Sequence, residues 1–463
     1  MVTTPRWRHA GRVALAVTLS LGASAGVATA HSGGLGGTGR DPIAVPMWLF
    51  LLTGGGVVGV SFLLASFVTD RRLIDAIHDW RRPLPTPGRL LRAAARLGAL
   101  ALLVAAVVVG YVGPGTGVRS LTILVVWVGW WGGYVATTYL VGNTWPTLNP
   151  FRTLAAPLPS LNRPYPDRLG AWPSVAGLLL LVWIEVMTPL ADDPRLLATV
   201  LVAYTGVTLA GTVVVGEEAW FDRVDPLARA FRLYGYLAPL TVESGRLRLR
   251  LPGADLPETA FEGQDDVAFV VTLLFVTTYD GFVATGLWAG VARAVVGVGA
   301  PPTALYLGAY LAGAALFYLA YRASARFSRR GADTHLTATY LARRFAPALL
   351  PIAAGYHLAH NFSSVLVLAP TLSVVAAAPL SPPPSPPQLA GLPTWFGGLE
   401  LACVLLGHLV AVWVAHATAY DVFPSRLQAV RSQYGVTAVM VGYTMLSLWI
   451  VAEPYVAPPF IAT

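Results

Sequence analysis

The sequence predicts an all-α protein, a polytopic transmembrane helix bundle with about ten spans after a cleavable signal peptide. Hydrophobic residues make up 55% of the 463 residues and charged residues only 12%, whereas soluble domains carry about 25% charged residues. The chain also contains 14 Trp and 18 Tyr, whose amphipathic rings favour the two membrane–water interfaces. Apolar runs of about 20 residues, the length of helix that crosses the hydrocarbon, recur along the chain. Together these features exclude an ordinary soluble domain.

Residues 1–30 have the three parts of a secretory signal peptide. Several arginines precede a small and apolar segment, residues 13–27, and Ala28-Thr29-Ala30 matches the small-x-small cleavage pattern. Cleavage at this point leaves His31 as the first residue of the mature chain. We expect residues 31–463 to form a single integral membrane domain, and the alternative is an uncleaved N-terminal anchor.

The later apolar segments that are long enough to cross the bilayer as helices follow one another closely. They are residues 46–68, 97–113, 120–141, 170–190, 195–216, 266–288, 302–321, 346–369, 395–418 and 434–455. The second of them is short, and we expect its helix to start within the arginine-rich segment 89–96. An even number of spans places the two ends of the mature chain on the same side of the membrane.

The arginines predict the orientation of these spans. All 31 basic residues are Arg, and 24 of them lie in the alternate loops 69–96, 142–169, 217–265, 322–345 and 419–433. Because basic loops stay in the cytoplasm, we expect both mature termini to lie on the external side of the cell membrane. Arginines placed between apolar spans suit the anionic headgroups of the lipid bilayer and not nucleic acid. The absence of Lys excludes Schiff-base chemistry and carboxylated-lysine metal bridges.

Two predicted loops have their own character. The cytoplasmic loop 217–265 is the largest, and within it the arginines of residues 246–250 alternate with leucines. This period of two predicts a short strand in a hairpin that turns at Gly245. The alternating arginines are either a lipid or regulatory contact or a solvated strand face. The external loop 370–394 is uncharged and rich in proline, which predicts an extended linker.

Ionisable side chains inside the apolar runs are the candidate functional residues, because charge in hydrocarbon is costly. They are Glu185, Asp280, His357, His360, Glu400, His408 and His416. His360 and His408 fall near the middle of two consecutive antiparallel spans, so we expect their rings to meet. Asp280 lies near the same depth, and His357 shares a helix face with His360. His416 lies near the cytoplasmic end of its predicted span.

Three interpretations of this cluster stay open. Neutral imidazoles with one or two carboxylates suit a divalent metal ion such as zinc, copper or iron. The same groups could relay protons, because a histidine titrates near neutral pH. They could also serve only as hydrogen bonds that hold the helices together. The predicted metal ligands are His360, His408, Asp280, His357, Glu185, His416 and His31.

His31 adds a possible metal site, and Cys403 limits the metal chemistry of the chain. The terminal amine and the imidazole of His31 can chelate copper together, and the glycines that follow leave this arm free; the alternative is an arbitrary residue after the cleavage site. Cys403 is the only cysteine. An intrachain disulfide and a cysteine-based zinc or iron–sulfur site are therefore excluded.

Several motifs along the mature chain carry a family resemblance. They are His31-Ser-Gly-Gly-Leu-Gly-Gly, Asn143-Thr-Trp-Pro-Thr-Leu-Asn-Pro, Tyr165-Pro-Asp-Arg-Leu-Gly-Ala-Trp-Pro, Tyr279-Asp-Gly-Phe and Arg431-Ser-Gln-Tyr. The chain resembles the fenitrothion hydrolase-like polytopic membrane proteins of actinobacteria and haloarchaea. The resemblance implies a membrane bundle whose pattern includes Asp280, His360, His408 and His416, while His357 departs from it. It also implies organophosphate hydrolysis, which here needs a metal-bound water in the membrane core.

The sequence leaves three classes of function open. The first is a metal-ion- or proton-linked transporter or permease for a small ion or molecule. The second is a membrane-embedded metal-dependent hydrolase, and the third is a non-catalytic membrane scaffold or assembly factor. The substrate, the identity of any metal and the oligomeric state do not follow from the sequence.

Overall fold

The computed structural model describes residues 47–115, 117–243, 245–259, 261–389, 392–393, 395–453 and 456–461. The structure is 74% helical, which confirms the all-α fold class. The predicted signal peptide and His31 lie outside the described residues.

Seven helical segments in the described ranges are long and apolar enough to cross a membrane. They are α4 (Arg89–Val112), α5 to α6 (Leu121–Leu140), α10 (Pro194–Val215), α13 (Gln264–Val283), α15 (Pro302–Ala332), α16 to α17 (Ala338–Ala377) and α18 (Phe396–Val422). The number rises to eight if α2 (Met47–Ser66) and α3 (Arg71–His78), which meet at a bend of 115°, form one broken span. The multi-pass architecture is thus supported with seven to eight candidate spans.

Two of the predicted spans are not among the seven. The range 170–190 falls on α9 (Trp172–Met187), whose 16 residues are fewer than the about 20 that cross the hydrocarbon. The range 434–455 falls on α19 (Arg426–Ala452), whose 27 residues are long enough to cross it. The count of ten stays a prediction.

The remaining described elements are short. The helices are α7 (Trp145–Leu148), α8 (Pro150–Ala155), α11 (Glu217–Ala219), α12 (Pro226–Gly235) and α14 (Gly286–Gly297). The 3-10 and π-helical turns are η1 (Gly117–Arg119), η3 (Asp167–Leu169), η4 (Trp220–Val224) and η5 (Ala346–Leu349), and the strands are β1 (Arg81–Leu84), β2 (Leu240–Glu243) and β3 (Arg246–Arg250).

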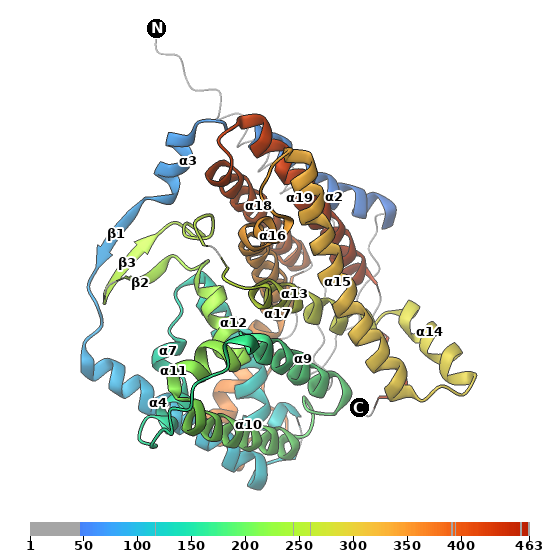
Figure 1. Ribbon diagram of the computed structural model, residues 1–463. Helices are drawn as coiled ribbons and strands as arrows, with labels where there is room; N and C mark the ends of the chain where they lie inside the picture. Colours follow the sequence, from blue (N-terminus) through green and yellow to red (C-terminus); the bar gives the residue numbers. More distant parts are fainter. Residues whose placement is uncertain are drawn as a thin grey trace.

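The helices form two groups on either side of α13 (Figure 1). One group contains α2, α15, α18 and α19, and the other contains α4, α9, α10 and the shorter α12. α13 packs against α9, α15 and α17. The apolar stretch of α13 is 78% buried, a larger share than in any other candidate span in the described chain. A polar side chain on α13 is therefore well placed to face the interior of the bundle.

Glycines allow close contact between α17 and α18. A Cβ atom added at Gly355 of α17 would lie 2.7 Å from the carbonyl oxygen of Cys403 in α18, and Gly407 of α18 faces Gly355 in turn. Small residues let membrane helices approach closely, because packing and not the hydrophobic effect drives their association. This contact fixes which faces of α17 and α18 meet.

The predicted loops hold more structure than expected. The hairpin at Gly245 is present: β2 and β3 pair antiparallel, and Gly245 has φ +76°, a conformation that favours glycine. A third strand, β1, pairs with β3 in the order β1-β3-β2 and was not predicted. In the other loop, α17 runs through Pro370 to Ala377, so the expected linker 370–394 was wrong in its first part.

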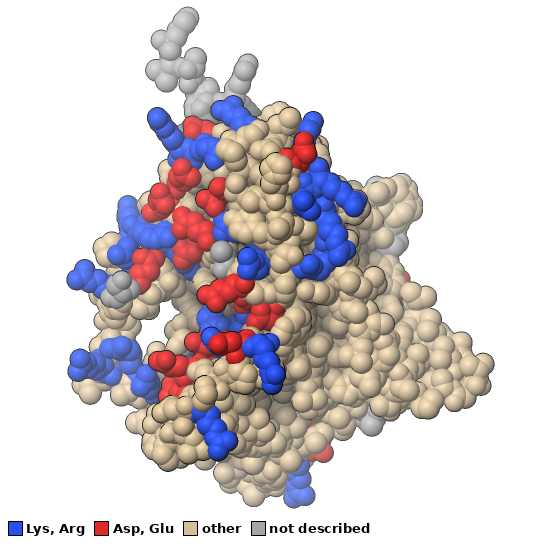
Figure 2. Space-filling model, in the orientation of Figure 1, with Lys and Arg blue, Asp and Glu red and all other residues tan. Residues whose placement is uncertain are grey.

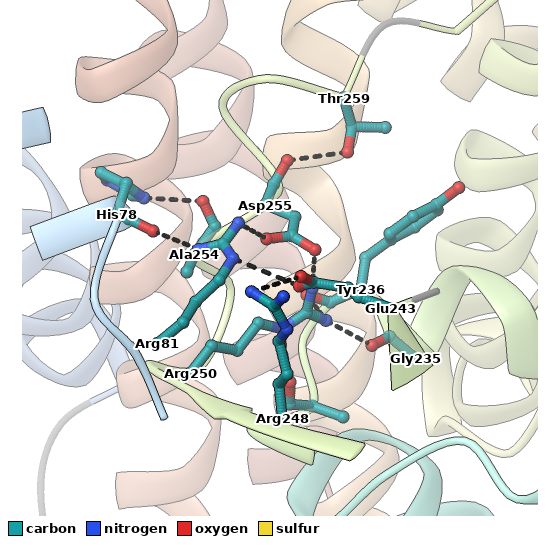
Figure 3. A network of polar contacts seen from close by, with 11 residues as sticks. His78, Arg81, Gly235, Tyr236, Glu243, Arg248, Arg250, Ala254, Asp255 and Thr259 are labelled. Atoms are coloured by element: carbon teal, nitrogen blue, oxygen red, sulfur yellow. Dashed lines mark hydrogen bonds and ion pairs between the residues drawn. The ribbon is translucent and has the colours of Figure 1, made fainter. Parts of the chain in front are cut away.

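A network of charged side chains holds this sheet to the loop behind it (Figure 3). Arg81 of β1 donates to Asp255 (2.8 Å) and pairs with Glu243 of β2 (3.2 Å). Arg250 of β3 also pairs with Asp255 and donates to the carbonyl oxygen of Gly235 (2.9 Å). Burial lowers the pKa of Arg250 to about 10, still far above neutrality, so the guanidinium stays charged. The network joins the segment before α4 to the segment before α13.

Charge is unevenly distributed over the surface (Figure 2). Arginines and carboxylates gather along one side of the face that is drawn, and the rest of that face is largely uncharged. Large apolar side chains such as Leu90 (88% exposed) and Val298 (86% exposed) stand open on the surface. Exposed apolar surface of this extent marks contact with another apolar phase. It supports a chain embedded in a lipid bilayer.

Candidate functional site

A cavity of about 1110 Å³ lies between α4, the π-helix η2 (Leu124–Tyr134), α9, α10, α13 and α17. Most of its lining is apolar, which is typical of sites for small organic ligands. The lining residues of α17 run from Tyr356 to Ala376. The cavity therefore extends along most of the length of this spanning helix.

Three of the predicted site residues meet at this cavity. Asp280 of α13, His360 of α17 and Glu185 of α9 all contribute to its lining. The Nε2 atom of His360 lies 3.6 Å from Oδ2 of Asp280, and Glu185 is close enough to Asp280 to interact with it electrostatically. We call these three residues the acid–imidazole cluster. Carboxyl and imidazole groups in an apolar cavity can bind a cation or pass a proton.

The neighbours of Asp280 and His360 hold them in position. The hydroxyl of Tyr279 donates to the carbonyl oxygen of Tyr306 (2.9 Å), which fixes the rotation of α13 next to Asp280. The ring of Tyr356 stacks on that of His360, one helical turn away, with centroids 6.0 Å apart. A tertiary contact thus fixes α13 beside Asp280, and a contact within α17 orients His360.

His357 also lines the cavity, but both of its ring nitrogens are hydrogen-bonded. Nε2 donates to the carbonyl oxygen of Trp131 (3.0 Å), and Nδ1 accepts from the hydroxyl of Tyr139 (2.9 Å). A carbonyl oxygen can only accept, so Nε2 carries a proton. A metal ion at His357 would have to displace one of these bonds.

The carbonyl that binds His357 belongs to an unusual helix. Residues Leu124–Tyr134 form the π-helix η2, which interrupts the span Leu121–Leu140. π-Helical turns are rare and occur frequently at functional sites. η2 also places Trp127, Trp130 and Trp131 along the cavity.

His408 and His416 lie elsewhere in the bundle, and neither lines the cavity. Nδ1 of His408 bonds to the carbonyl oxygen of Val404 in its own helix (2.9 Å), whereas His360 lies near Asp280. His416 bonds to the carbonyl oxygen of Val68 (2.8 Å) and to Gln433 (3.3 Å), so it links α18 to the end of α2 and to α19.

The described residues contain no group of three or more His, Cys, Asp or Glu side chains that could hold a metal ion. The predicted site for zinc, copper or iron therefore stays a prediction, and so does copper binding at His31.

Sequence reasoning missed the aromatic wall and the hydrogen bonds of His357. The segment Trp127–Trp131 contains three tryptophans within one apolar run. Tryptophans usually mark a membrane interface, at the ends of a span. Their place inside the run was a signal that they face a cavity.

The chain matches no protein-family model, no curated protein and no solved structure. The resemblance to fenitrothion hydrolase-like proteins stays a prediction, and the functional argument rests on the site itself.

Proposed function

We infer that this chain is a proton-linked transporter or permease of the cell membrane, with about ten spans and both mature termini outside. The observation that carries the proposal is the long apolar cavity with Glu185, Asp280 and His360 in its wall. Ionisable groups are retained inside a membrane mainly where an ion, a proton or a polar substrate passes. A cavity that extends along a span offers such a passage.

A second set of polar groups supports proton movement away from the cluster. His357 is three residues from His360 on the same helix face, and its Nδ1 bonds to the hydroxyl of Tyr139. The ring of Tyr139 lies 5.3 Å from that of Tyr234 in α12, between centroids. In the proposed mechanism, Asp280 exchanges a proton with His360, and the His357–Tyr139 pair extends the route toward α12.

The test uses proteoliposomes that contain the purified full chain, an imposed pH gradient and an entrapped pH-sensitive dye. Small molecules are added one at a time, and a compound whose transport is linked to protons changes the rate at which the gradient decays. We expect Asp280→Asn to abolish this compound-dependent change. The matched control is Asp192→Asn, because Asp192 lines the end of the same cavity outside the acid–imidazole cluster.

Two results would contradict the proposal. One is uptake of a compound that responds neither to the pH gradient nor to Asp280→Asn. The other is hydrolysis of an organophosphate ester by the metal-supplemented protein without any transport, which would favour the hydrolase class.

A further inference from the structure

The ionisable groups of the cavity have the sign that suits a cation. The described lining contains three carboxyl groups, those of Glu185, Asp192 and Asp280, two imidazoles and no arginine. The whole chain carries 31 arginines and a net charge of +8, so the absence of arginine from this lining departs from the composition. An anion in this cavity would meet no fixed positive charge, whereas a cation can be neutralised by a carboxylate.

Aromatic rings form a second cation-binding feature of the same lining. They belong to Trp127, Trp130, Trp131, Tyr134 and Tyr356. The rings of Trp130 and Trp131 are 6.0 Å apart and tilted by 41°, and the ring of Tyr356 lies against His360 beside Asp280. The negative face of an aromatic ring attracts cations, and Trp does so most strongly where water is excluded.

The size and polarity of the cavity narrow the class of cation. A volume of about 1110 Å³ is slightly above the range for sites of drug-sized ligands, about 300–1,000 Å³. A small hydrated ion would have to give up its hydration shell in a cavity whose lining is mostly apolar, at a large free-energy cost. A bulky cation with apolar substituents instead gains from burial against the same walls.

We propose that this cavity binds a bulky lipophilic monocation, which is exchanged for a proton held by the Glu185–Asp280 pair. The inference rests on the proposed function and names the class of its substrate. The exchange balances in charge: one proton leaves a carboxyl group through His360 to water, and the cation takes its place beside the carboxylate. Two neighbouring carboxylates are costly to charge in hydrocarbon without a counter-ion, so binding and proton release are linked.

The experiment compares two probes of nearly the same shape and opposite charge, tetraphenylphosphonium and tetraphenylborate. Saturable binding of each radiolabelled probe to the purified full chain is measured in detergent, with an excess of the unlabelled probe as competitor. Proton release is followed with a pH dye at low buffer concentration. We expect saturable binding of tetraphenylphosphonium with release of about one proton per cation, and no saturable binding of tetraphenylborate.

Variants test the two features separately. Asp280→Asn should weaken tetraphenylphosphonium binding at least about tenfold and abolish proton release. Trp131→Leu should weaken binding by about 2- to 30-fold, the range of cation–π energies, while the exposed Trp172, changed to Leu, is the matched control and should leave it unchanged. Elution of each variant as a monodisperse species excludes misfolding. The comparison of the two probes on the unmodified chain needs no variant.

The outcomes separate this inference from the proposed function. Equal or tighter binding of tetraphenylborate, or cation binding without proton release, would overturn the inference. Proton-linked transport of a neutral compound without cation binding would overturn the inference and leave the proposed function standing. Cation binding with proton release in detergent, but no transport in proteoliposomes, would sustain the inferred site and refute the transporter.

Discussion

Asp225 gives the clearest prediction for the pH dependence of stability. It lies between η4 and α12, 1% exposed, and its Oδ1 accepts from the backbone N–H of Ala228 (2.8 Å) as the N-cap of α12. Burial raises the pKa of Asp225 from 3.8 to about 6, although the backbone N–H bonds of α12 oppose the shift. A shift of about two units corresponds to about 3 kcal/mol, at about 1.4 kcal/mol per unit.

The sign follows from proton linkage. The folded chain keeps the Asp225 proton to a higher pH than the unfolded chain does, so this residue lowers the free energy of unfolding as pH rises from about 4 to about 6. Asp225→Asn is neutral at every pH and keeps a capping oxygen. The variant should therefore gain about 3 kcal/mol over the unmodified chain at pH 7 and little at pH 4.

The assay measures unfolding of the purified protein in detergent at pH values between 4 and 7. The control is Asp222→Asn, because the side chain of Asp222 is 60% exposed. Parallel stability profiles for Asp225→Asn and the unmodified chain would show that Asp225 is already ionised in the folded state and would refute the reasoning.

Three further predictions concern other contacts. Replacing the buried Arg250 by Met removes one of the two arginine partners of Asp255 and the donor to the carbonyl oxygen of Gly235, and should cost about 1–3 kcal/mol, measured as a lower melting temperature, while the exposed Arg246, changed to Met, should have little effect. Gly355→Val forces α17 and α18 apart and should reduce the yield of monodisperse protein, whereas Gly290→Val meets open space and should not. Tyr139→Phe leaves Nδ1 of the buried His357 without a donor and should cost about 1–3 kcal/mol, measured by thermal unfolding; an unchanged melting temperature would contradict the bond.

Hydrophobic runs predicted where the helices lie but not where they end. Each predicted span falls on a helix, because the apolar length that crosses a bilayer is visible in the sequence. The helices continue where hydropathy stops: α15 was expected to end at residue 321 and runs to Ala332 through an arginine-rich segment. β1 escaped prediction because a strand of four residues that ends in Pro-Leu has little pattern of its own and depends on its pairing with β3.

The sequence predicted how far along its span each site residue lies. It did not predict how each helix is rotated about its axis. Asp280 and His360 were assigned similar depths, and the structure brings them together. His408 has a similar depth on the next span, but its Nδ1 bonds to Val404 in its own helix and it does not line the cavity. The Gly355–Gly407 contact sets how α17 and α18 face each other, and such a contact depends on both helices at once.

The hydrogen bonds of His357 and His416 fix the positions of these two imidazoles. The two ring nitrogens of His357 and of His416 are all engaged, so these imidazoles already have the partners that burial requires. His360 lies in the cavity wall, 3.6 Å from the carboxylate of Asp280. A proton or a cation that enters the cavity can reach this imidazole and this carboxylate together, which is why His360 and Asp280 are where the proposed function should be tested first.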